Sequence, residues 1–199
     1  MTLGRNMQPS SFSIFAILLL TSLLQGCAGI MVGGAAATAT AMHDRRTLGV
    51  FIEDQTIEFK AAEAIAGDEE LDDNSLIHVT SYNMVALITG QTANQALKQR
   101  AEQYVSQVDR VRRVVNELEI GSTASLGERT RDAALVTEIK FKLTGIDIPD
   151  FDPLRVKVVA ERGSIYLMGL LTQKEGDAVT DLVRHISGVR RVVKVFEYY

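Results

Sequence analysis

Gly188-Val189-Arg190-Arg191-Val192-Val193 lies near the end of the chain, and most of this stretch occurs a second time in the sequence. Val111-Arg-Arg-Val-Val115 repeats Val189-Arg-Arg-Val-Val193 at a separation of 78 residues. Further upstream, Gly90 matches Gly169 at a separation of 79 residues. A single loop deletion produces such a one-residue change of spacing, and the period is too long for a solenoid repeat. The sequence therefore predicts two small domains of about 70 residues each.

Both copies show the same succession of predicted elements, which is helix, strand, strand, helix, strand. The opening helices carry apolar residues at helical spacing, as with Leu135, Ile139 and Leu143 in the second copy. Asp54 and Asp132 lie close to the start of these helices, where a carboxylate stabilises the exposed amide groups. We therefore assign both aspartates to the first turn or to the position just before it.

Alternating apolar residues after each opening helix predict a hairpin. Ile77 and Val79 face one side of the first strand, and His78 faces the less buried side. The tight links are Tyr82-Asn83-Met84 and Glu161-Arg162-Gly163, in which Asn83 and Gly163 supply residues that tolerate a positive φ angle.

Glycines, helices and strands complete each copy in the same way. We expect Gly90 and Gly169 to end the second strands. The predicted second helices are roughly residues 94–108 and 173–186, and the predicted last strands are residues 111–118 and 189–197.

This order of elements, with a Gly-Val-x-x-Val entry to the third strand, resembles the BON domain. The second copy matches at Gly188-Val189-Arg190-Arg191-Val192, whereas the first copy has Arg110 and Met84 where the family usually places glycines. The resemblance implies an α+β fold of two tandem BON domains, residues 47–120 and 121–199. Each domain is expected to be αββαβ, with two helices packed on a three-stranded mixed sheet.

The only cysteine of the chain lies in Leu24-Gln25-Gly26-Cys27, behind an apolar run from Phe12 to Leu24 and a basic start at Arg5. The run is shorter than the roughly 20 residues that a membrane-spanning helix needs. The four residues resemble the lipobox of bacterial lipoproteins, which implies that residues 1–26 are a signal peptide. It also implies that Cys27 carries a diacylglycerol and a fatty acid. The alternative is a buried structural cysteine that follows a signal anchor.

Acylation of Cys27 would leave no thiol for disulfides, metal sites or catalysis, so we expect no cofactor besides this covalent lipid. Ala28 and Gly29 follow the cysteine. In lipoproteins of this kind the lack of an aspartate there implies the outer membrane, with the body facing the periplasm. Residues 27–46 contain a run of small uncharged residues and are predicted to be a flexible tether. The alternative is a short alanine-rich helix on the bilayer.

Charge separates the two copies. Residues 44–120 hold 8 basic and 14 acidic residues, a net charge of −6, whereas residues 121–199 hold 12 basic and 11 acidic residues, a net charge of +1. An anionic bilayer would repel the first domain and tolerate the second. The overall charge of −4 argues against nucleic acid as the main partner.

BON domains are commonly described as phospholipid-binding, so the resemblance implies anionic phospholipid of the outer-membrane inner leaflet as a partner. The matching surface is the opening helix of the second copy, predicted over Thr130 to Leu143, where cations surround an aromatic residue off the core stripe. The predicted lipid-binding residues are Arg129, Arg131, Ala134, Lys140, Phe141 and Lys142. Ala134 stands where dual-BON lipoproteins often carry a large aromatic residue. The alternative is a solvated helix with Phe141 packed against the neighbouring domain.

No pattern in the sequence predicts catalysis or a metal site. The acidic run Asp68 to Asp73 lacks the spacing and glycine of an EF-hand, and the three histidines have no neighbours at ligand spacing. We therefore expect a non-enzymatic protein that binds lipid and supports envelope integrity. The alternative is a protein-interaction adaptor whose acidic first domain docks an outer-membrane assembly complex, with the lipid anchor as the sole membrane contact.

Overall fold

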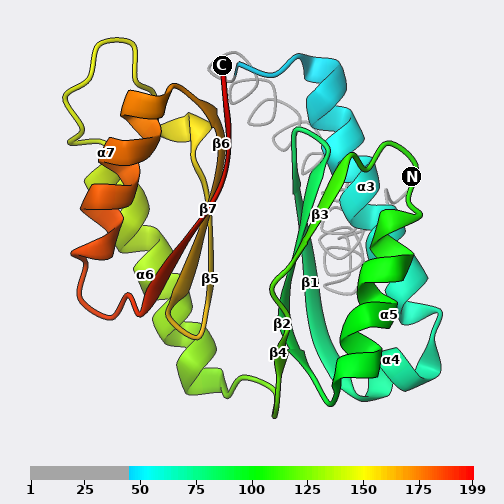
Figure 1. Cartoon of the computed structure of the whole chain (residues 1–199). Helices are drawn as coiled ribbons and strands as arrows, with labels where there is room; N and C mark the ends of the chain where they lie inside the picture. Colours follow the sequence, from blue (N-terminus) through cyan, green and yellow to red (C-terminus); the bar gives the residue numbers. More distant parts are fainter. Residues whose placement is uncertain (1–44) are drawn as a thin grey trace, which may run out of the picture. The chain divides into compact units, whose positions relative to one another are not determined.

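The computed structural model describes residues 45–199, so the predicted signal peptide, Cys27 and most of the predicted tether lie outside the described residues. The described residues all belong to one compact unit. The labelled elements of Figure 1 are α3 Leu48–Ala66, α4 Glu69–Asp73, β1 Ser75–Tyr82, β2 Val85–Thr92, α5 Gln95–Ser106, β3 Arg113–Asn116, β4 Glu119–Ile120, α6 Leu126–Leu143, β5 Lys157–Glu161, β6 Ser164–Leu171, α7 Gln173–Arg184 and β7 Arg191–Tyr198. A short 3-10 helix, Pro153–Arg155, precedes β5.

Both domains have the predicted αββαβ order. In the first domain β2 pairs with β1 in antiparallel and with β3 in parallel orientation, and in the second β6 pairs in the same way with β5 and β7. The two-residue strand β4 also pairs with β2, which gives the first sheet a fourth strand. The predicted α+β fold of two tandem BON-like domains is therefore confirmed, with mixed sheets of three and four strands.

Each domain has its own core between its helices and one face of its sheet. In the second domain Leu135, Ile139 and Leu143 of α6 are buried against Ile165 and Leu167 of β6, as the helical spacing predicted. Ile57, Ala61 and Ile65 of α3 take the same places in the first domain. The sequence thus gives the inner face of each opening helix correctly.

The second face of each sheet is buried against the other domain. Val85 and Leu87 alternate along β2 with Ala86 and Ile88, and both sets are buried. Val85 and Leu87 share a third apolar cluster with Tyr166 and Met168 of β6. The sheets thus face each other while the helices cover the outer faces (Figure 1). His78 is exposed as predicted, but most of this second face is not open to water.

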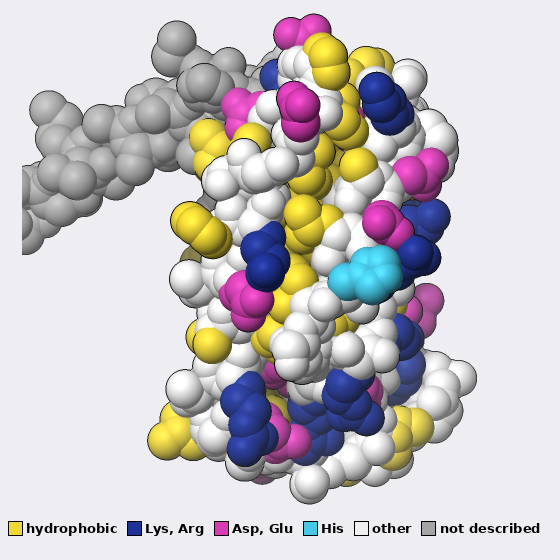
Figure 2. Space-filling view, turned by 90° about the vertical axis from the view of Figure 1, so that its left-hand side faces the viewer, with side chains coloured by type: hydrophobic (Ala, Val, Ile, Leu, Met, Phe, Trp, Pro, Cys, Tyr) yellow, Lys and Arg dark blue, Asp and Glu magenta, His cyan; other side chains and the backbone are white. Residues whose placement is uncertain are grey.

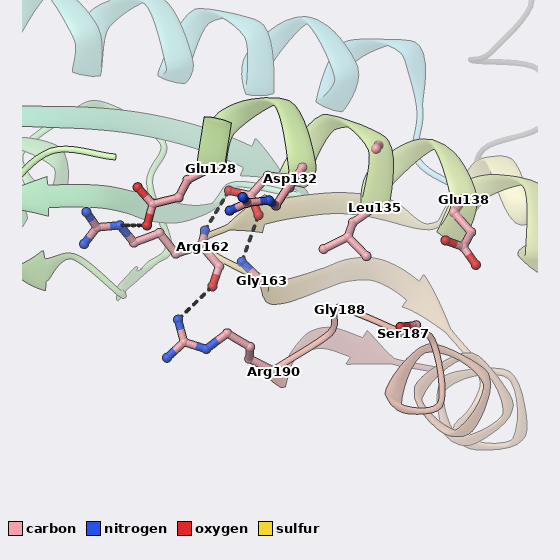
Figure 3. Close-up of a pocket in the computed structure, with 11 residues that line it drawn as sticks. Glu128, Asp132, Leu135, Glu138, Arg162, Gly163, Ser187, Gly188 and Arg190 are labelled. Atoms are coloured by element: carbon pink, nitrogen blue, oxygen red, sulfur yellow. Dashed lines mark hydrogen bonds and ion pairs between the residues drawn. The ribbon is translucent and has the colours of Figure 1, made fainter. Parts of the chain in front are cut away.

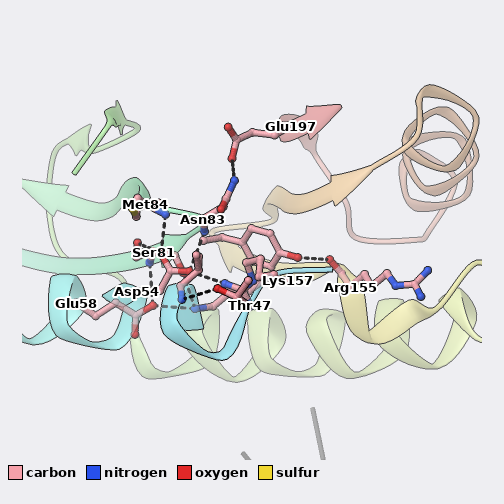
Figure 4. Close-up of polar contacts among 12 residues, drawn as sticks. Thr47, Asp54, Glu58, Ser81, Asn83, Met84, Arg155, Lys157 and Glu197 are labelled. Atoms are coloured by element: carbon pink, nitrogen blue, oxygen red, sulfur yellow. Dashed lines mark hydrogen bonds and ion pairs between the residues drawn. The ribbon is translucent and has the colours of Figure 1, made fainter. Parts of the chain in front are cut away.

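The aspartates of the opening helices hold the hairpin turns, so their assignment to the first turn was wrong. Asp54 is the seventh residue of α3 and accepts hydrogen bonds from Ser81 Oγ at 2.7 Å, Asn83 N at 2.8 Å and Met84 N at 2.7 Å (Figure 4). Asp132 takes the same position in α6. It accepts from the backbone N–H groups of the second turn at 2.7 and 2.8 Å. A buried carboxylate thus ties each opening helix to its hairpin.

Both hairpin turns have two residues with positive φ angles, which fits a type I′ turn. Asn83 and Met84 have φ angles of 51° and 62°, and Arg162 and Gly163 have 47° and 74°. Met84 therefore occupies the position of the missing glycine without a change of backbone. Arg110, at the other departure from the family pattern, also has a positive φ angle of 71°.

Gly90 and Gly169 lie inside β2 and β6, so the prediction that they end these strands was wrong. A Cβ atom on Gly90 would lie 1.9 Å from the carbonyl oxygen of Leu76 on the neighbouring strand. Close approach of two backbones therefore explains this glycine better than a strand end does.

Ion pairs beside β3 and on β7 join the domains. Arg112 binds Glu197 at 2.8 Å, and Arg191 binds Glu117 at 2.8 Å. One arginine of each Val-Arg-Arg-Val-Val stretch is therefore used between the domains. A buried bond from Gln91 Nε2 to Glu161 Oε1 at 2.6 Å crosses the same interface.

The last two residues of the predicted tether also contact the folded body. Arg45 binds both carboxylate oxygens of Glu175 in the second domain, at 2.7 and 2.9 Å. Arg46 binds Asp54 in the first domain and lies over the ring of Tyr82, 3.6 Å from its centroid. The chain therefore enters the body at the junction of the two domains.

Candidate functional site on helix α6

Helix α6 begins with a capping box that fixes its orientation. Glu128 N donates to Ser125 Oγ at 3.3 Å, and Ser125 N donates to Glu128 Oε2 at 2.8 Å. Hydrogen bonds from the Ser125 side chain and backbone lower the pKa of Glu128, so its carboxylate stays ionised. The helix starts at Leu126, four residues before the predicted start.

All six predicted lipid-binding residues are exposed, but they lie on two flanks of the helix. A rotation of about 100° per residue places Arg131, Ala134, Phe141 and Lys142 on one flank, and Arg129 and Lys140 on the other. Phe141 is 76% exposed and does not pack against the first domain. Leu126, at the start of the helix, is 73% exposed.

A pocket of about 400 Å³ opens beside the first of these flanks (Figure 3). Its lining comes from three segments, namely α6, the β5–β6 turn and the loop that enters β7. The lining residues are Glu128, Arg131, Asp132, Ala134, Leu135, Glu138, Arg162, Gly163, Ser187, Gly188 and Arg190. Ser187, Gly188 and Arg190 thus form one wall, and two of the six predicted residues, Arg131 and Ala134, line the pocket.

The pocket combines apolar lining with three arginines. Arg162 lies 3.4 Å from Glu128, and its buried Nε atom makes no hydrogen bond within the described residues. Arg190 Nη1 donates to the backbone oxygen of Arg162 at 3.3 Å. Arg131 forms no ion pair within residues 45–199. Arg131 and Arg190 can therefore turn their guanidinium groups toward a phosphate or carboxylate in the pocket.

Acidic side chains limit what the pocket can bind. Asp132 is committed to the hairpin, and Glu128 to the helix cap. Glu138 lies 3.7 Å from Lys142 on the same helix. Figure 2 shows the same mixture over the outer face of the second domain, where basic side chains gather at the lower end with acidic ones among them. The site thus suits a phosphate ester with an attached apolar part better than a simple polyanion.

Sequence reasoning missed Arg162 and Arg190 as partners of the α6 surface. Both residues lie in stretches that the sequence singled out, the hairpin link and the third-strand entry. Only the strand register brings them together, because Ser164 on β6 pairs with Arg191 on β7.

Two further properties concern the part of the chain that the structure describes. No group of three or more histidine, cysteine, aspartate or glutamate side chains in it could hold a metal ion. Among the same residues, no helix has the length and apolar character needed to cross a membrane.

Comparison with known proteins gives matches over most of the chain. The family model of the BON domain matches residues 53–122 and 131–198. The outer membrane lipoprotein DolP of Haemophilus influenzae is 36% identical over 184 residues, which cover 92% of this chain and 94% of that protein. The 21 kDa hemolysin of Actinobacillus pleuropneumoniae is 28% identical over 155 residues, 78% of this chain and 79% of that one.

Among solved structures, a match is CdsD, a structural protein of the type III secretion system of Chlamydia trachomatis. It is 14% identical, with a TM-score of 0.29, over 73% of this chain and 63% of that chain. The match spans less than two thirds of the solved chain.

Proposed function

The chain belongs to the BON-domain family, and we propose that it is an outer-membrane lipoprotein whose second domain binds anionic phospholipid. Cys27 carries the covalent lipid, the body faces the periplasm, and the protein supports the integrity of the envelope. The name of the Haemophilus relative supports the location and the lipidation. Helix α6 and its pocket support the lipid chemistry.

The observation that carries the proposal is the exposed aromatic ring of Phe141 on a helix flank that also holds Arg131 and the pocket. An apolar ring beside cations is the composition of a surface that inserts at the boundary between headgroups and acyl chains. The guanidinium groups of Arg131 and Arg190 reach phosphate, while the apolar lining of the pocket accepts the carbon atoms next to it.

The test is vesicle binding by residues 43–199, which form one compact unit without the acyl chains. Phe141→Ser should weaken binding to phosphatidylglycerol vesicles at least tenfold, because a phenylalanine ring contributes about 1.5–3 kcal/mol on burial. Reversing the charge of Lys140 and Lys142 should weaken it further, at about 1 kcal/mol per lost cation near the surface. Purely zwitterionic vesicles should bind weakly.

Phe59→Ser is the matched control, because Phe59 on α3 is 71% exposed and belongs to the other domain. Its binding should equal that of the unchanged protein. Equal loss in both phenylalanine variants would contradict a site on α6. No binding of the unchanged body to either kind of vesicle would leave the acyl chains as the only membrane contact.

A further inference from the structure

A second hollow, of about 180 Å³, lies in the first domain between α3, α4 and β1. Seven of its nine lining residues are apolar, and the residues are Ala62, Ile65, Ala66, Leu71, Asp72, Ser75, Leu76, Ile77 and Val79. Phe59 lies one turn before Ala62 on α3 and is largely exposed. The outer side of α3 and the strand β1 therefore form the two walls of an apolar groove, which we call the α3–β1 groove.

Strand β1 is the edge strand of its sheet, whose order is β1-β2-β3. Tyr82 and Val85 flank a two-residue turn and so form a hydrogen-bonded pair, which makes every second residue of β1 bond to β2. The backbone N–H and C=O groups of Ile77 and Val79 consequently point away from β2. Four backbone groups are thus directed to the free edge beside the hollow.

Ser81, two residues further on, shows how the protein covers such groups elsewhere. Its N–H donates to Glu58 Oε1 at 2.8 Å, and its carbonyl oxygen accepts from Lys157 Nζ at 3.2 Å. Within residues 45–199, no comparable partner covers the edge groups of Ile77 and Val79. An open edge next to an apolar hollow is the arrangement that accepts an added strand.

The surroundings of the groove are acidic. Helix α4 lines one end of it and presents exposed carboxylates at Glu69, Glu70, Asp72 and Asp73. Arg100 pairs with Glu70, but the other three carboxylates form no ion pair within the described residues. Lysines commonly guard exposed strand edges, whereas here the strand runs Ser75-Leu-Ile-His-Val-Thr80 without a lysine or arginine. The charge therefore favours a basic occupant over an anionic lipid.

We propose that the α3–β1 groove binds an extended, basic segment of a partner protein. The segment adds to β1 as an edge strand, places an apolar side chain in the hollow and directs cationic side chains toward α4. The groove belongs to the first domain and α6 to the second, so the proposal does not depend on lipid binding by α6 (Figure 1).

The first test uses the full-length lipoprotein in living bacteria. A photoreactive phenylalanine analogue replaces Ala66, which lines the hollow, and in a control strain it replaces Gln55. Gln55 is exposed on the same helix, eleven residues away or about 16 Å along the helix axis. We expect an adduct with one protein at position 66, at least tenfold stronger than at position 55. The crosslinked stretch should show alternating apolar and basic residues on mass-spectrometric mapping.

The second test asks whether the groove itself makes the contact. Ala62→Arg places a cation and a long side chain in the hollow, at an exposed helical position that tolerates both. The adduct should fall at least tenfold, while vesicle binding stays unchanged. Adding a synthetic peptide of the mapped stretch should slow hydrogen exchange of the Ile77 and Val79 amides at least tenfold. The amides of His78 and Thr80, which already bond to β2, should change little.

Several results would overturn the proposal. One is the absence of any adduct at position 66. Another is an adduct only with lipid, with a second copy of the chain or with residues 27–44 of the same chain. A third is a crosslinked stretch that proves to be acidic. An adduct that survives Ala62→Arg, or a peptide that leaves Ile77 and Val79 exchanging freely, would do the same. Because vesicle binding is measured in parallel, failure here is distinguishable from failure of the lipid proposal.

Discussion

Replacing Asp132 with alanine should destabilise the protein by about 3 kcal/mol, because this carboxylate holds the turn between β5 and β6. Asp132 is 7% exposed and accepts backbone hydrogen bonds from Arg162 at 2.7 Å and Gly163 at 2.8 Å. A hydrogen bond to a charged group contributes about 1.5–3 kcal/mol. Two such bonds give about 3–6 kcal/mol. The free energy regained because alanine does not bury a charge must be subtracted from this.

Urea denaturation followed by circular dichroism measures the loss, because the sequence contains no tryptophan for fluorescence. Asp132→Asn keeps one acceptor oxygen and should cost about half as much. Asp54→Ala should cost more than Asp132→Ala, because Asp54 also accepts from Ser81 Oγ and binds Arg46. The shared apolar cluster between the sheets should keep unfolding a single transition in every variant.

Asp147→Ala provides the control, since Asp147 lies exposed in the loop after α6 and should change stability by less than about 0.5 kcal/mol. If Asp132→Ala lowered the free energy of unfolding no more than this control does, the turn would not depend on the carboxylate. The reasoning would then be refuted for both domains.

Three further predictions concern buried groups. Burial opposes ionisation of Glu175, but hydrogen bonds from Arg45 and Thr172 overcome it and hold its pKa at about 2. The ionised Glu175 therefore stabilises the fold above pH 4.5, and this stabilisation is lost as the pH falls toward 2. Arg45→Gln should move the pH midpoint of acid unfolding upward, and an unchanged midpoint would contradict this prediction. Burial raises the pKa of Tyr166 to about 12, so the stability of the fold should fall as the pH rises from about 10 toward 12, and Tyr166 should ionise late in an absorbance titration. Gly90→Ala should abolish cooperative folding, measured by thermal unfolding, because its Cβ would meet the Leu76 oxygen; a normal melting curve would show that β1 can move aside.

The parts of the fold that the sequence predicted correctly are those that local periodicity indicates. Leu135, Ile139 and Leu143 recur at intervals of four residues, and this interval alone defines the buried side of a helix. The order of elements follows from such patterns, and so does the two-domain organisation. The same information places Phe141 off the core stripe of α6, where it is exposed.

Contacts between distant segments account for what the sequence left open. Asp54 resembles a first-turn residue, but its partners lie on a hairpin almost thirty residues later. Tyr166 and Leu87 obey strand alternation, which marks them as the second face of a sheet without saying what covers that face. The pocket beside α6 forms only when α6, the β5–β6 turn and the loop before β7 come together in the fold. No single stretch of sequence predicts that arrangement.

Packing of sheet against sheet determines which surfaces remain for function. A BON-like domain by itself has one sheet face uncovered, and in this protein each domain covers that face of the other. The exposed parts are therefore the helix layers, which face opposite directions, and the sheet edges (Figure 1). If α6 binds a bilayer as proposed, the bilayer lies on the side of the molecule away from α3. The acidic first domain, which an anionic surface would repel, then faces the aqueous side with its open β1 edge. The opposite charges of the two domains thus fit a body that binds lipid on one side and protein on the other.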